Sequence, residues 1–165
     1  MAIAYIALGS NLKDPVQQVG QALDALKQLP QTQLVKASSL YLTAPVGYDN
    51  QPDFINAVAY VSTSLTPEAL LTHLLAIEAA FGRERPFPNA PRVLDLDLLL
   101  YDNVKMQTTV LTLPHPRMHL RSFVMLPLAE IAPELVLPAG GSVALLAEQF
   151  LDQGIKKLSH YSSKS

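Results

Sequence analysis

The sequence predicts an α+β fold, for three reasons. Strand-like and helix-like apolar patterns follow one another in the order strand, helix, strand, strand, helix, strand. Hydrophobic residues make up 49% of the 165 residues and charged residues only 16%, which is typical of one globular domain with a substantial core. The 13 prolines gather between the predicted elements, where a fixed φ and a missing N–H donor mark ordered connections.

The chain begins with a predicted strand over residues 2–8, followed by a helix. Asp14 and Pro15 are typical of a helix start, because Asp supplies a side-chain acceptor at the cap and Pro suits the first position. The apolar residues that follow recur at helical spacing and predict one buried stripe, which consists of Val16, Val19, Leu23, Leu26 and Leu29.

Strands 33–42 and 54–63 come next, and the loop between them, 43–52, is long enough to suggest a functional role. Thr66 and Pro67 then open a second helix by the same cap-and-proline device. Its predicted apolar stripe consists of Leu70, Leu74, Ile77 and Phe81.

A second long loop, 83–92, leads into a predicted strand over 94–101. After it we expect a hairpin around 102–103, a Pro-His-Pro turn, a helix from Ser122 and a last helix near 143–150. The order β-α-β-β-α-β is that of the split unit whose antiparallel sheet carries both helices on one face. We therefore predict a ferredoxin-like core with a C-terminal helical and hairpin elaboration.

Composition and charge exclude several classes of protein. The net charge is −2 with no long run of one sign, so the electrostatic footprint of a non-specific nucleic-acid binder is absent. Cysteine is absent, which excludes disulfides, a thiol nucleophile and a Cys-based zinc site. No basic leader precedes the first strand, and no apolar stretch approaches the ~20 residues that span a bilayer. We expect a cytoplasmic protein with one domain over 1–160 and a frayed tail, 161–165.

The most informative residues are Asp95 and Asp97, which interrupt an otherwise apolar strand. Residues two apart in a strand point to the same face, about 7 Å apart. Such a pair suits one or two Mg²⁺ ions held against a phosphate chain, and Arg92 precedes it as a forked donor to the same phosphates. The alternative, for so short a motif, is a solvated pair at an exposed strand end.

Ordered motifs run through nearly the whole chain. They are AYIALGSN at 4–11, PRVLDLD at 91–97, LPHPRM at 113–118 and IAPEL at 131–135. In this order and spacing they resemble the 6-hydroxymethyl-7,8-dihydropterin pyrophosphokinase family of folate biosynthesis. The resemblance implies the same β-α-β-β-α-β core and an enzyme that transfers diphosphate from ATP to the pterin hydroxymethyl group, releasing AMP.

The resemblance implies a catalytic group around the phosphates. In it Asp95 and Asp97 hold two Mg²⁺ ions that bridge the triphosphate, and no side chain is obliged to act as a general base. Transfer of this kind depends on alignment of the nucleophile with the β-phosphorus and on cations around the developing charge. Arg83 and Arg92 match positions that act on the phosphates, from a loop that closes over ATP. Without the resemblance, Arg83 and Arg85 would count as ordinary solvated loop residues.

The resemblance also implies a set of ATP-binding residues, namely Glu78, Arg85, Arg92, Thr112, His115 and Arg121. For Glu78 the alternative is a solvated helix face, and for His115 it is simple turn chemistry between two prolines. His115 and His119 are four residues apart, but Pro116 between them and the lack of a clear third ligand argue against zinc.

A pterin is flat and polar, so its site needs aromatic faces and hydrogen bonds around the edge. The resemblance implies that Phe54 and Phe123 stack on it and that Asn56, on the same strand face as Phe54, binds its edge. Each phenylalanine alone is more typical of a core. The other implied substrate contacts belong to the first long loop and are Thr43, Ala44, Pro45 and Val46.

The chain departs from the commonest family pattern in two places. Residues 89–92 are Asn-Ala-Pro-Arg where many members carry Trp-Gly-Pro-Arg, and Phe87 is the candidate replacement for the missing aromatic side chain. Leu75 and Val110 stand where some members place polar or basic groups near ATP. These differences leave the reaction class intact and bear on nucleotide affinity and loop closure.

Three rival functions are a ferredoxin-like small-metabolite binding module, an RNA-binding module and a Mg²⁺-dependent phosphohydrolase. A passive sensor does not need paired Asp residues with a nearby Arg. An RNA-binding sheet would carry exposed aromatic and basic side chains, and the first strand offers only Tyr5. A hydrolase would release AMP without a pterin. We expect a monomer that acts on ATP and the pterin, with no nucleic-acid or membrane partner.

Overall fold

The computed structural model describes the protein at residues 1–11, 14–43, 53–82, 93–138, 140–151 and 155–158. The predicted tail, most of the first long loop and the whole of the second lie outside these ranges. Among the described helices, none is long and apolar enough to cross a membrane.

The helices and strands confirm the predicted order. Along the chain they are β1 (Ala2–Ser10), α1 (Pro15–Lys27), β2 (Thr32–Ala37), β3 (Tyr41–Thr43), β4 (Phe54–Thr63), α2 (Pro67–Phe81), β5 (Asp95–Tyr101), β6 (Met106–Gln107), β7 (Thr112–Leu113), the 3₁₀ helix η1 (Met118–Leu120), α3 (Ser122–Ile131), α4 (Val143–Glu148) and β8 (Lys156–Lys157). The predicted strand 54–63 and the helix from Ser122 have the expected starts.

One six-stranded antiparallel sheet organises the fold. Its strands lie in the order β5-β1-β4-β3-β8, and β2 also pairs with β4. β1 therefore lies between β4 and β5, and the helix α2 connects these two strands along the chain. This antiparallel sheet with two helices in its connections confirms the predicted ferredoxin-like core.

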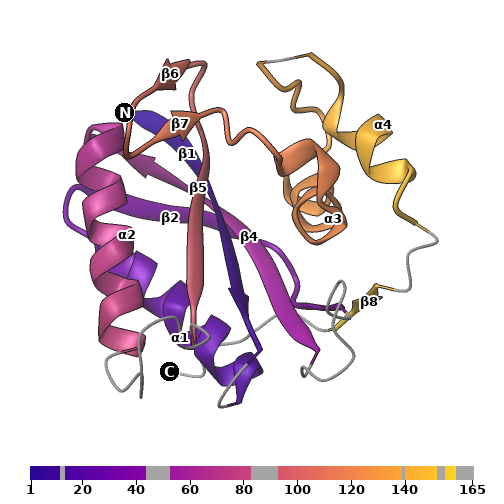
Figure 1. The fold of residues 1–165 in the computed structure, drawn as a ribbon, viewed down its shortest axis with the longest axis horizontal. Helices are drawn as coiled ribbons and strands as arrows, with labels where there is room; N and C mark the ends of the chain where they lie inside the picture. Colours follow the sequence, from indigo (N-terminus) through magenta and orange to yellow (C-terminus); the bar gives the residue numbers. More distant parts are fainter. Residues whose placement is uncertain (12–13, 44–52, 83–92, 139, 152–154, 159–165) are drawn as a thin grey trace.

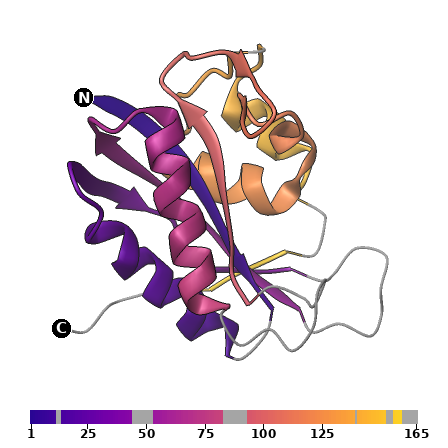
Figure 2. The same ribbon diagram turned by 60° about the vertical axis from the view of Figure 1, so that its left-hand side comes forward.

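Helices cover the sheet on both faces (Figure 1). α1 and α2 pack on one face, over a core that includes Ile6 and Leu8 of β1. α3 covers the other, which we call the α3 face, over Ala7 of β1 and Val58 of β4, and α4 packs against α3. Figure 2 shows the same separation after rotation, with α1 and α2 in front of the sheet and α3 behind. Because strand side chains alternate between faces, one strand contributes to both cores.

The two main helices begin where predicted, but by different means. Thr66 caps α2, because its side chain accepts the backbone N–H of Ala69 at 3.1 Å. Asp14 precedes α1 without a side-chain cap, so that prediction was wrong; its φ of 64° is left-handed. Val16 is 41% exposed, which corrects the predicted stripe. The buried stripe begins one turn later and consists of Val19, Ala22, Leu23 and Leu26.

The predicted strand 33–42 is divided into β2 and β3, because a serine side chain interrupts the ladder. Ser38 donates its backbone N–H to the Val58 carbonyl at 2.8 Å. Its hydroxyl, in place of a main-chain carbonyl, accepts the backbone N–H of Val58 at 3.0 Å. A side chain that competes for a backbone partner breaks regular pairing.

The predicted hairpin at 102–103 is wrong, because the turn there does not join two paired strands and the hairpin lies further along the chain. Asp102 follows β5 in a turn whose backbone N–H donates to the Ile3 carbonyl, and its Oδ1 accepts the backbone N–H of Ile3, both at 2.8 Å. The turn is thereby tied to β1. The hairpin lies later, between β6 and β7, where Thr108 Oγ1 accepts the backbone N–H of Leu111 at 3.0 Å.

Candidate active site

A row of residues across four strands organises the site. Gly9 of β1 pairs with Asp95 of β5 on one side and with Asn56 of β4 on the other, and Asn56 pairs with Tyr41 of β3. Residues directly opposite in antiparallel strands share a face, here the α3 face. The predicted first strand stopped before Gly9, which was wrong, because Gly9 and Ser10 continue the ladder with β4.

Asp95 and Asp97 lie on this face at the start of β5. Leu96 between them is buried in the core under α1 and α2, so the two carboxylates share the opposite face, as strand periodicity predicted. Both residues are partly exposed, and the Asp97 side chain is 46% exposed. Carboxylates that are accessible at a strand start can hold a divalent cation and still be reached by a phosphate chain.

Arg121, directly before α3, lies near the Asp97 carboxylate and the Phe123 ring. Its Nη1 is 3.9 Å from Asp97 Oδ2, and its guanidinium carbon is 5.7 Å from the centroid of the Phe123 ring. At this distance the guanidinium does not donate a hydrogen bond to Asp97. Its N–H groups can therefore donate to a phosphate oxygen that binds beside the carboxylate. A predicted ATP-binding residue is thereby brought beside a predicted pterin-stacking residue.

His115 is held against β5 in one orientation. Its backbone N–H donates to the Leu99 carbonyl at 2.9 Å, and its Nδ1 accepts the backbone N–H of Arg117 at 3.1 Å. Burial lowers the pKa of His115; Asp97 opposes this shift, while Arg121 and Arg117 add to it. A neutral imidazole whose Nδ1 is an acceptor carries its proton on Nε2, and is therefore a donor there.

A cleft of about 280 Å³ brings several predicted ATP-binding residues together. It lies between α2, β5 and the segment around β7, and Glu78, Asp97, Thr112 and His115 all line it. The rest of the lining is largely apolar and includes Leu71, Leu75, Val110 and Leu111. An apolar wall beside a few polar groups suits a ligand with a flat organic part and a charged part. Leu75 and Val110, the two residues near ATP that depart from the family pattern, are both in this wall.

Glu78 is more than a solvated helix residue. Its Oε2 accepts the backbone N–H of Leu96 at 2.6 Å, which joins α2 to β5. The contact lies between the two Asp residues of β5, so Glu78 also sets the helix against the strand that carries them. Glu78 is therefore not on a merely solvated helix face, and its predicted contact with ATP stays a prediction.

The predicted pterin side of the site lies around Asn56. Its Nδ2 donates to Thr43 Oγ1 at 2.9 Å, and both residues are buried. The ladder puts Phe54 on the same face, and α3, which carries Phe123, packs over this part of the sheet. A Cβ at Gly9 would lie 2.8 Å from Asn56 Oδ1, so the amide oxygen occupies space that only glycine leaves free.

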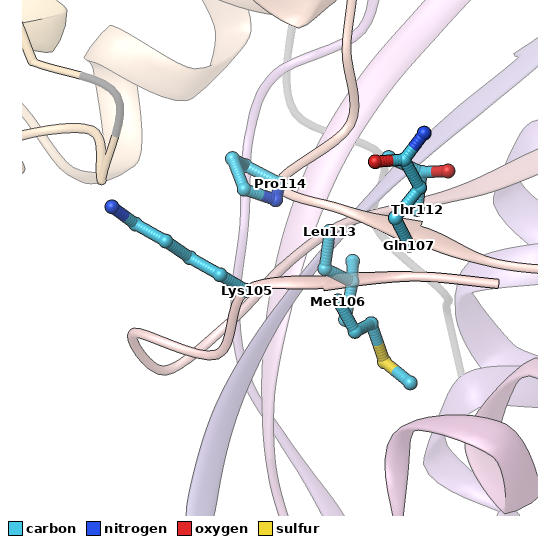
Figure 3. A pocket seen from close by; sticks show the side chains of 6 residues that line it. All are labelled: Lys105, Met106, Gln107, Thr112, Leu113 and Pro114. Atoms are coloured by element: carbon cyan, nitrogen blue, oxygen red, sulfur yellow. The ribbon is translucent and has the colours of Figure 1, made fainter.

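A second pocket, of about 430 Å³, lies on the β6–β7 hairpin (Figure 3). Gln107 and Thr112 are ladder partners and lie together, whereas the Lys105 side chain extends away from them. Thr112 is the only predicted site residue in its lining, which consists of Lys105, Met106, Gln107, Thr112, Leu113 and Pro114. This pocket therefore adjoins the cleft and is not itself the predicted site.

The remaining predicted site residues lie outside the described residues; they are Arg83, Arg85, Arg92, Ala44, Pro45 and Val46. Within the described ranges, no group of three or more His, Cys, Asp or Glu side chains could hold a metal ion. The candidate metal ligands there remain the pair Asp95 and Asp97.

Sequence reasoning missed three residues that the structure places in or beside the site: Gly9, Tyr41 and Glu130. Gly9 was placed just after the predicted first strand and given no role, and Tyr41 was treated as one residue of the predicted strand 33–42. Glu130 accepts the Tyr41 hydroxyl at 2.7 Å. The available signal was a polar residue, Asn56, in an apolar strand, because a buried amide needs partners. Only the strand register shows that Gly9 and Tyr41 are its neighbours.

Comparison with known proteins identifies related sequences. A model of the family described as 7,8-dihydro-6-hydroxymethylpterin-pyrophosphokinase matches residues 5–133. The 2-amino-4-hydroxy-6-hydroxymethyldihydropteridine pyrophosphokinase of Haemophilus influenzae is 49% identical over 158 residues, which cover 96% of this chain and 99% of that protein. A protein of the same name from Bacillus subtilis is 44% identical over 133 residues, covering 81% of this chain and 80% of that protein.

Solved structures resemble the fold. The wild-type HPPK-DHPS of Plasmodium falciparum, crystallised with SDX-DHP, superposes with a TM-score of 0.71 over 93% of this chain, at 15% sequence identity. The matched region is 44% of that longer chain, so this chain spans less than half of it. At this identity the likeness supports the fold alone.

Proposed function

This chain belongs to the 7,8-dihydro-6-hydroxymethylpterin-pyrophosphokinase family and is an ATP-dependent pyrophosphokinase of folate biosynthesis, and we propose that the row of residues on the α3 face sets the geometry of its reaction. The reaction moves a diphosphate unit from ATP to the hydroxymethyl oxygen of 6-hydroxymethyl-7,8-dihydropterin. AMP is then the leaving group, and the β-phosphorus is the atom attacked.

Asp95 and Asp97 are the proposed ligands of two Mg²⁺ ions. Their shared face and partial exposure support this role, and carboxylate oxygens are ligands that Mg²⁺ prefers. When bound, the ions supply positive charge to the triphosphate and lower the proton affinity of the acceptor hydroxyl. Arg121, 3.9 Å from Asp97, adds a donor for a phosphate oxygen beside the pair.

ATP is proposed to occupy the cleft between α2 and β5. The apolar wall that includes Leu75 and Val110 suits the adenine ring. His115, neutral and protonated on Nε2, would donate to the phosphate chain without adding a charge. Arg83, Arg85 and Arg92, in the second long loop, are proposed to supply further positive charge on the phosphates, as the family resemblance implies.

The acceptor is proposed to bind beside Asn56, between Phe54 and Phe123. The amide of Asn56 is oriented by its bond to Thr43, so its carbonyl oxygen is presented to a ligand donor. The loop residues Ala44, Pro45 and Val46 are proposed as further contacts with the pterin, again from the family resemblance. Two aromatic faces and one edge-binding amide are the recognition groups that a flat polar ring requires.

The separation of Asp95 from Asn56 carries the proposal. The two residues lie in one row with Gly9 between them, so they are two strand spacings apart, about 10 Å. A pterin held at its edge by Asn56 would extend its hydroxymethyl group over Gly9 toward the carboxylates. That arrangement aligns the nucleophile with the diphosphate, and such reactions depend chiefly on alignment.

The reaction itself is the test of this proposal. The protein is incubated with ATP, Mg²⁺ and 6-hydroxymethyl-7,8-dihydropterin, and AMP, ADP and the pterin product are resolved. We expect AMP to form only with the pterin and in step with its diphosphate ester. AMP without pterin dependence would favour a hydrolase, and no reaction with folded protein would favour the metabolite-binding module.

We further propose that the enzyme acts as a cytoplasmic monomer. Activity that stays proportional to protein concentration at dilutions where light scattering shows a monomer would agree with this. A loss of specific activity on dilution would contradict it.

A further inference from the structure

Glu130, in the last turn of α3, accepts hydrogen bonds from β3 and from the segment directly before β3. Its carboxylate accepts the Ser39 backbone N–H at 3.0 Å, the Ser39 hydroxyl at 2.9 Å and the Tyr41 hydroxyl at 2.7 Å. Lys157 of β8 lies 3.9 Å away, and the Glu130 side chain is only 17% exposed. Charge-assisted bonds of this kind are stronger than neutral ones. Glu130 therefore fastens α3 to β3 and to the segment before it.

These bonds join the two walls of the proposed acceptor site. Tyr41 is the ladder partner of Asn56, and Thr43, two residues later, accepts the Asn56 amide. Phe123 lies about two turns before Glu130 on the same helix. α3 contains Pro127 between these two residues, yet it continues as one helix from Ser122 to Ile131. The anchor at Glu130 therefore bears on the place of Phe123 relative to Asn56 through a continuous helix.

The anchor lies beside the break between β2 and β3. At Ser38 the hydroxyl replaces a backbone acceptor, so β2 and β3 are separate strands. β3 is three residues long, and its pairing with β8 involves only Tyr41 and Leu42. Three residues is the short end of the usual strand length, and Glu130 adds contacts at Ser39 and Tyr41 to the pairing of β3 with β4 and β8.

The charge state of the network is stable near neutral pH. Burial raises the pKa of Glu130, but the hydrogen bonds from Tyr41 and Ser39 and the charge of Lys157 outweigh it, so the pKa lies below its ordinary value. Burial, the hydrogen bond to Glu130 and its negative charge all raise the pKa of Tyr41. The carboxylate therefore remains an acceptor and the phenol remains a donor.

We propose that Glu130 is a positioning residue for the acceptor, which holds Phe123 on α3 and Asn56 on β4 at the spacing that the pterin ring requires. It acts through Tyr41 and through α3, and contacts neither substrate. This inference rests on the proposed function, because it places the acceptor between Phe123 and Asn56.

The test compares two affinities in the variant Glu130→Gln. This variant keeps the side-chain shape, but replaces one acceptor oxygen with an NH₂ group that faces donors. We expect the affinity for 6-hydroxymethyl-7,8-dihydropterin, measured with a saturating non-hydrolysable ATP analogue and Mg²⁺, to fall about tenfold. The affinity for the ATP analogue alone should stay unchanged. Tyr41→Phe, which removes one donor, should show a smaller loss in the same direction.

Two control variants separate positioning from general destabilisation. Glu134→Gln makes the same chemical change at an exposed carboxylate four residues along the chain. Leu26→Ala creates a cavity at a fully buried position of α1, under the opposite face of the sheet. Both controls are expected to keep the pterin affinity of the wild type.

Unchanged pterin affinity in folded Glu130→Gln would overturn the positioning role. So would a parallel loss of pterin and ATP-analogue affinity, or a loss of pterin affinity equal to that in Leu26→Ala. If Glu130→Gln does not fold, Tyr41→Phe decides by the same comparison. Failure of the wild-type protein to bind the pterin overturns the proposed function together with this inference, and it is observed before any variant is measured.

Discussion

At Gly9 the lack of a side chain is what makes the proposed reaction geometry available. Asn56 and Asp95 lie on either side of Gly9 in the sheet. A Cβ at Gly9 would lie 2.8 Å from the Asn56 amide oxygen. Three residues of the row have separate proposed roles, in which Asn56 binds the acceptor, Gly9 leaves room for the acceptor, and Asp95 binds the metal. The strand register places these three residues in order.

Gly9→Ala should weaken acceptor binding selectively. The added methyl would contact Asn56 Oδ1 at 2.8 Å, so the amide must rotate and lose its hydrogen bond to Thr43. Loss of such a bond costs about 1 kcal/mol, so we expect the KM for the pterin to rise roughly five- to tenfold. Steady-state kinetics check this, with the KM for ATP as the internal control. Equal changes in both KM values would contradict it.

Asp95→Ala and Asp97→Ala should each reduce turnover far more than stability. Each variant removes a proposed metal ligand at the phosphates, for which a loss of roughly 100-fold or more in kcat is expected. Asp24→Ala is the matched control, since Asp24 pairs with Lys27 on the surface of α1, at 3.5 Å. Turnover and thermal unfolding are measured for all three. Wild-type turnover in both site variants would refute the metal assignment.

At the scale of the elements, local signals were predictable and long-range ones were not. The start of α2 follows from Thr66 and Pro67, and β4 from its own apolar run. The division at Ser38 depends on Val58, twenty residues away, and the turn at Asp102 depends on Ile3. The candidate site divides in the same way. That Asp95 and Asp97 share a face follows from strand periodicity, whereas their neighbours Arg121 and Asn56 follow only from register and packing.

Thr66→Ala should destabilise the fold without changing catalysis. The variant removes the side-chain acceptor for the Ala69 N–H, which is worth about 1 kcal/mol at a helix N-terminus. Urea unfolding measures the loss. Thr72→Ala, the same change in the exposed interior of α2, should not destabilise, because alanine favours helix. If both variants lose the same stability, the cap does not contribute as proposed.

In the part of the molecule that the structure describes, a six-stranded sheet lies between two helical layers with different roles, and β6 and β7 form a separate two-stranded sheet. The layer of α1 and α2 supplies the larger hydrophobic core, and α2 also lines the proposed ATP cleft. The layer of α3 and α4 covers the face that carries the row of site residues. The proposed acceptor therefore binds where the C-terminal part of the chain packs on the sheet, so the stability of that packing and affinity for the acceptor are linked.

Stability should depend on pH through Glu130. Because its pKa in the folded protein lies below the ordinary 4.5, its contribution is fully present above pH 4.5 and is lost as pH falls through the folded value. Tyr41, whose pKa is raised, stays protonated in that acid range, and Lys157 is the other charged side chain that faces Glu130. The difference in unfolding free energy between wild type and Glu130→Gln should therefore be largest near neutral pH and shrink below pH 4.5. A difference that is constant from pH 7 to about 3 would contradict the charged network.

The most direct test of the proposed geometry is a crystal structure of the protein with Mg²⁺, a non-hydrolysable ATP analogue and 6-hydroxymethyl-7,8-dihydropterin. We predict Mg²⁺ on Asp95 and Asp97, and the pterin edge on Asn56. The hydroxymethyl oxygen should lie above Gly9, in line with the β-phosphorus. Metal bound away from the two carboxylates, or a pterin that does not contact Asn56, would contradict the proposal that one row of the sheet aligns the two substrates.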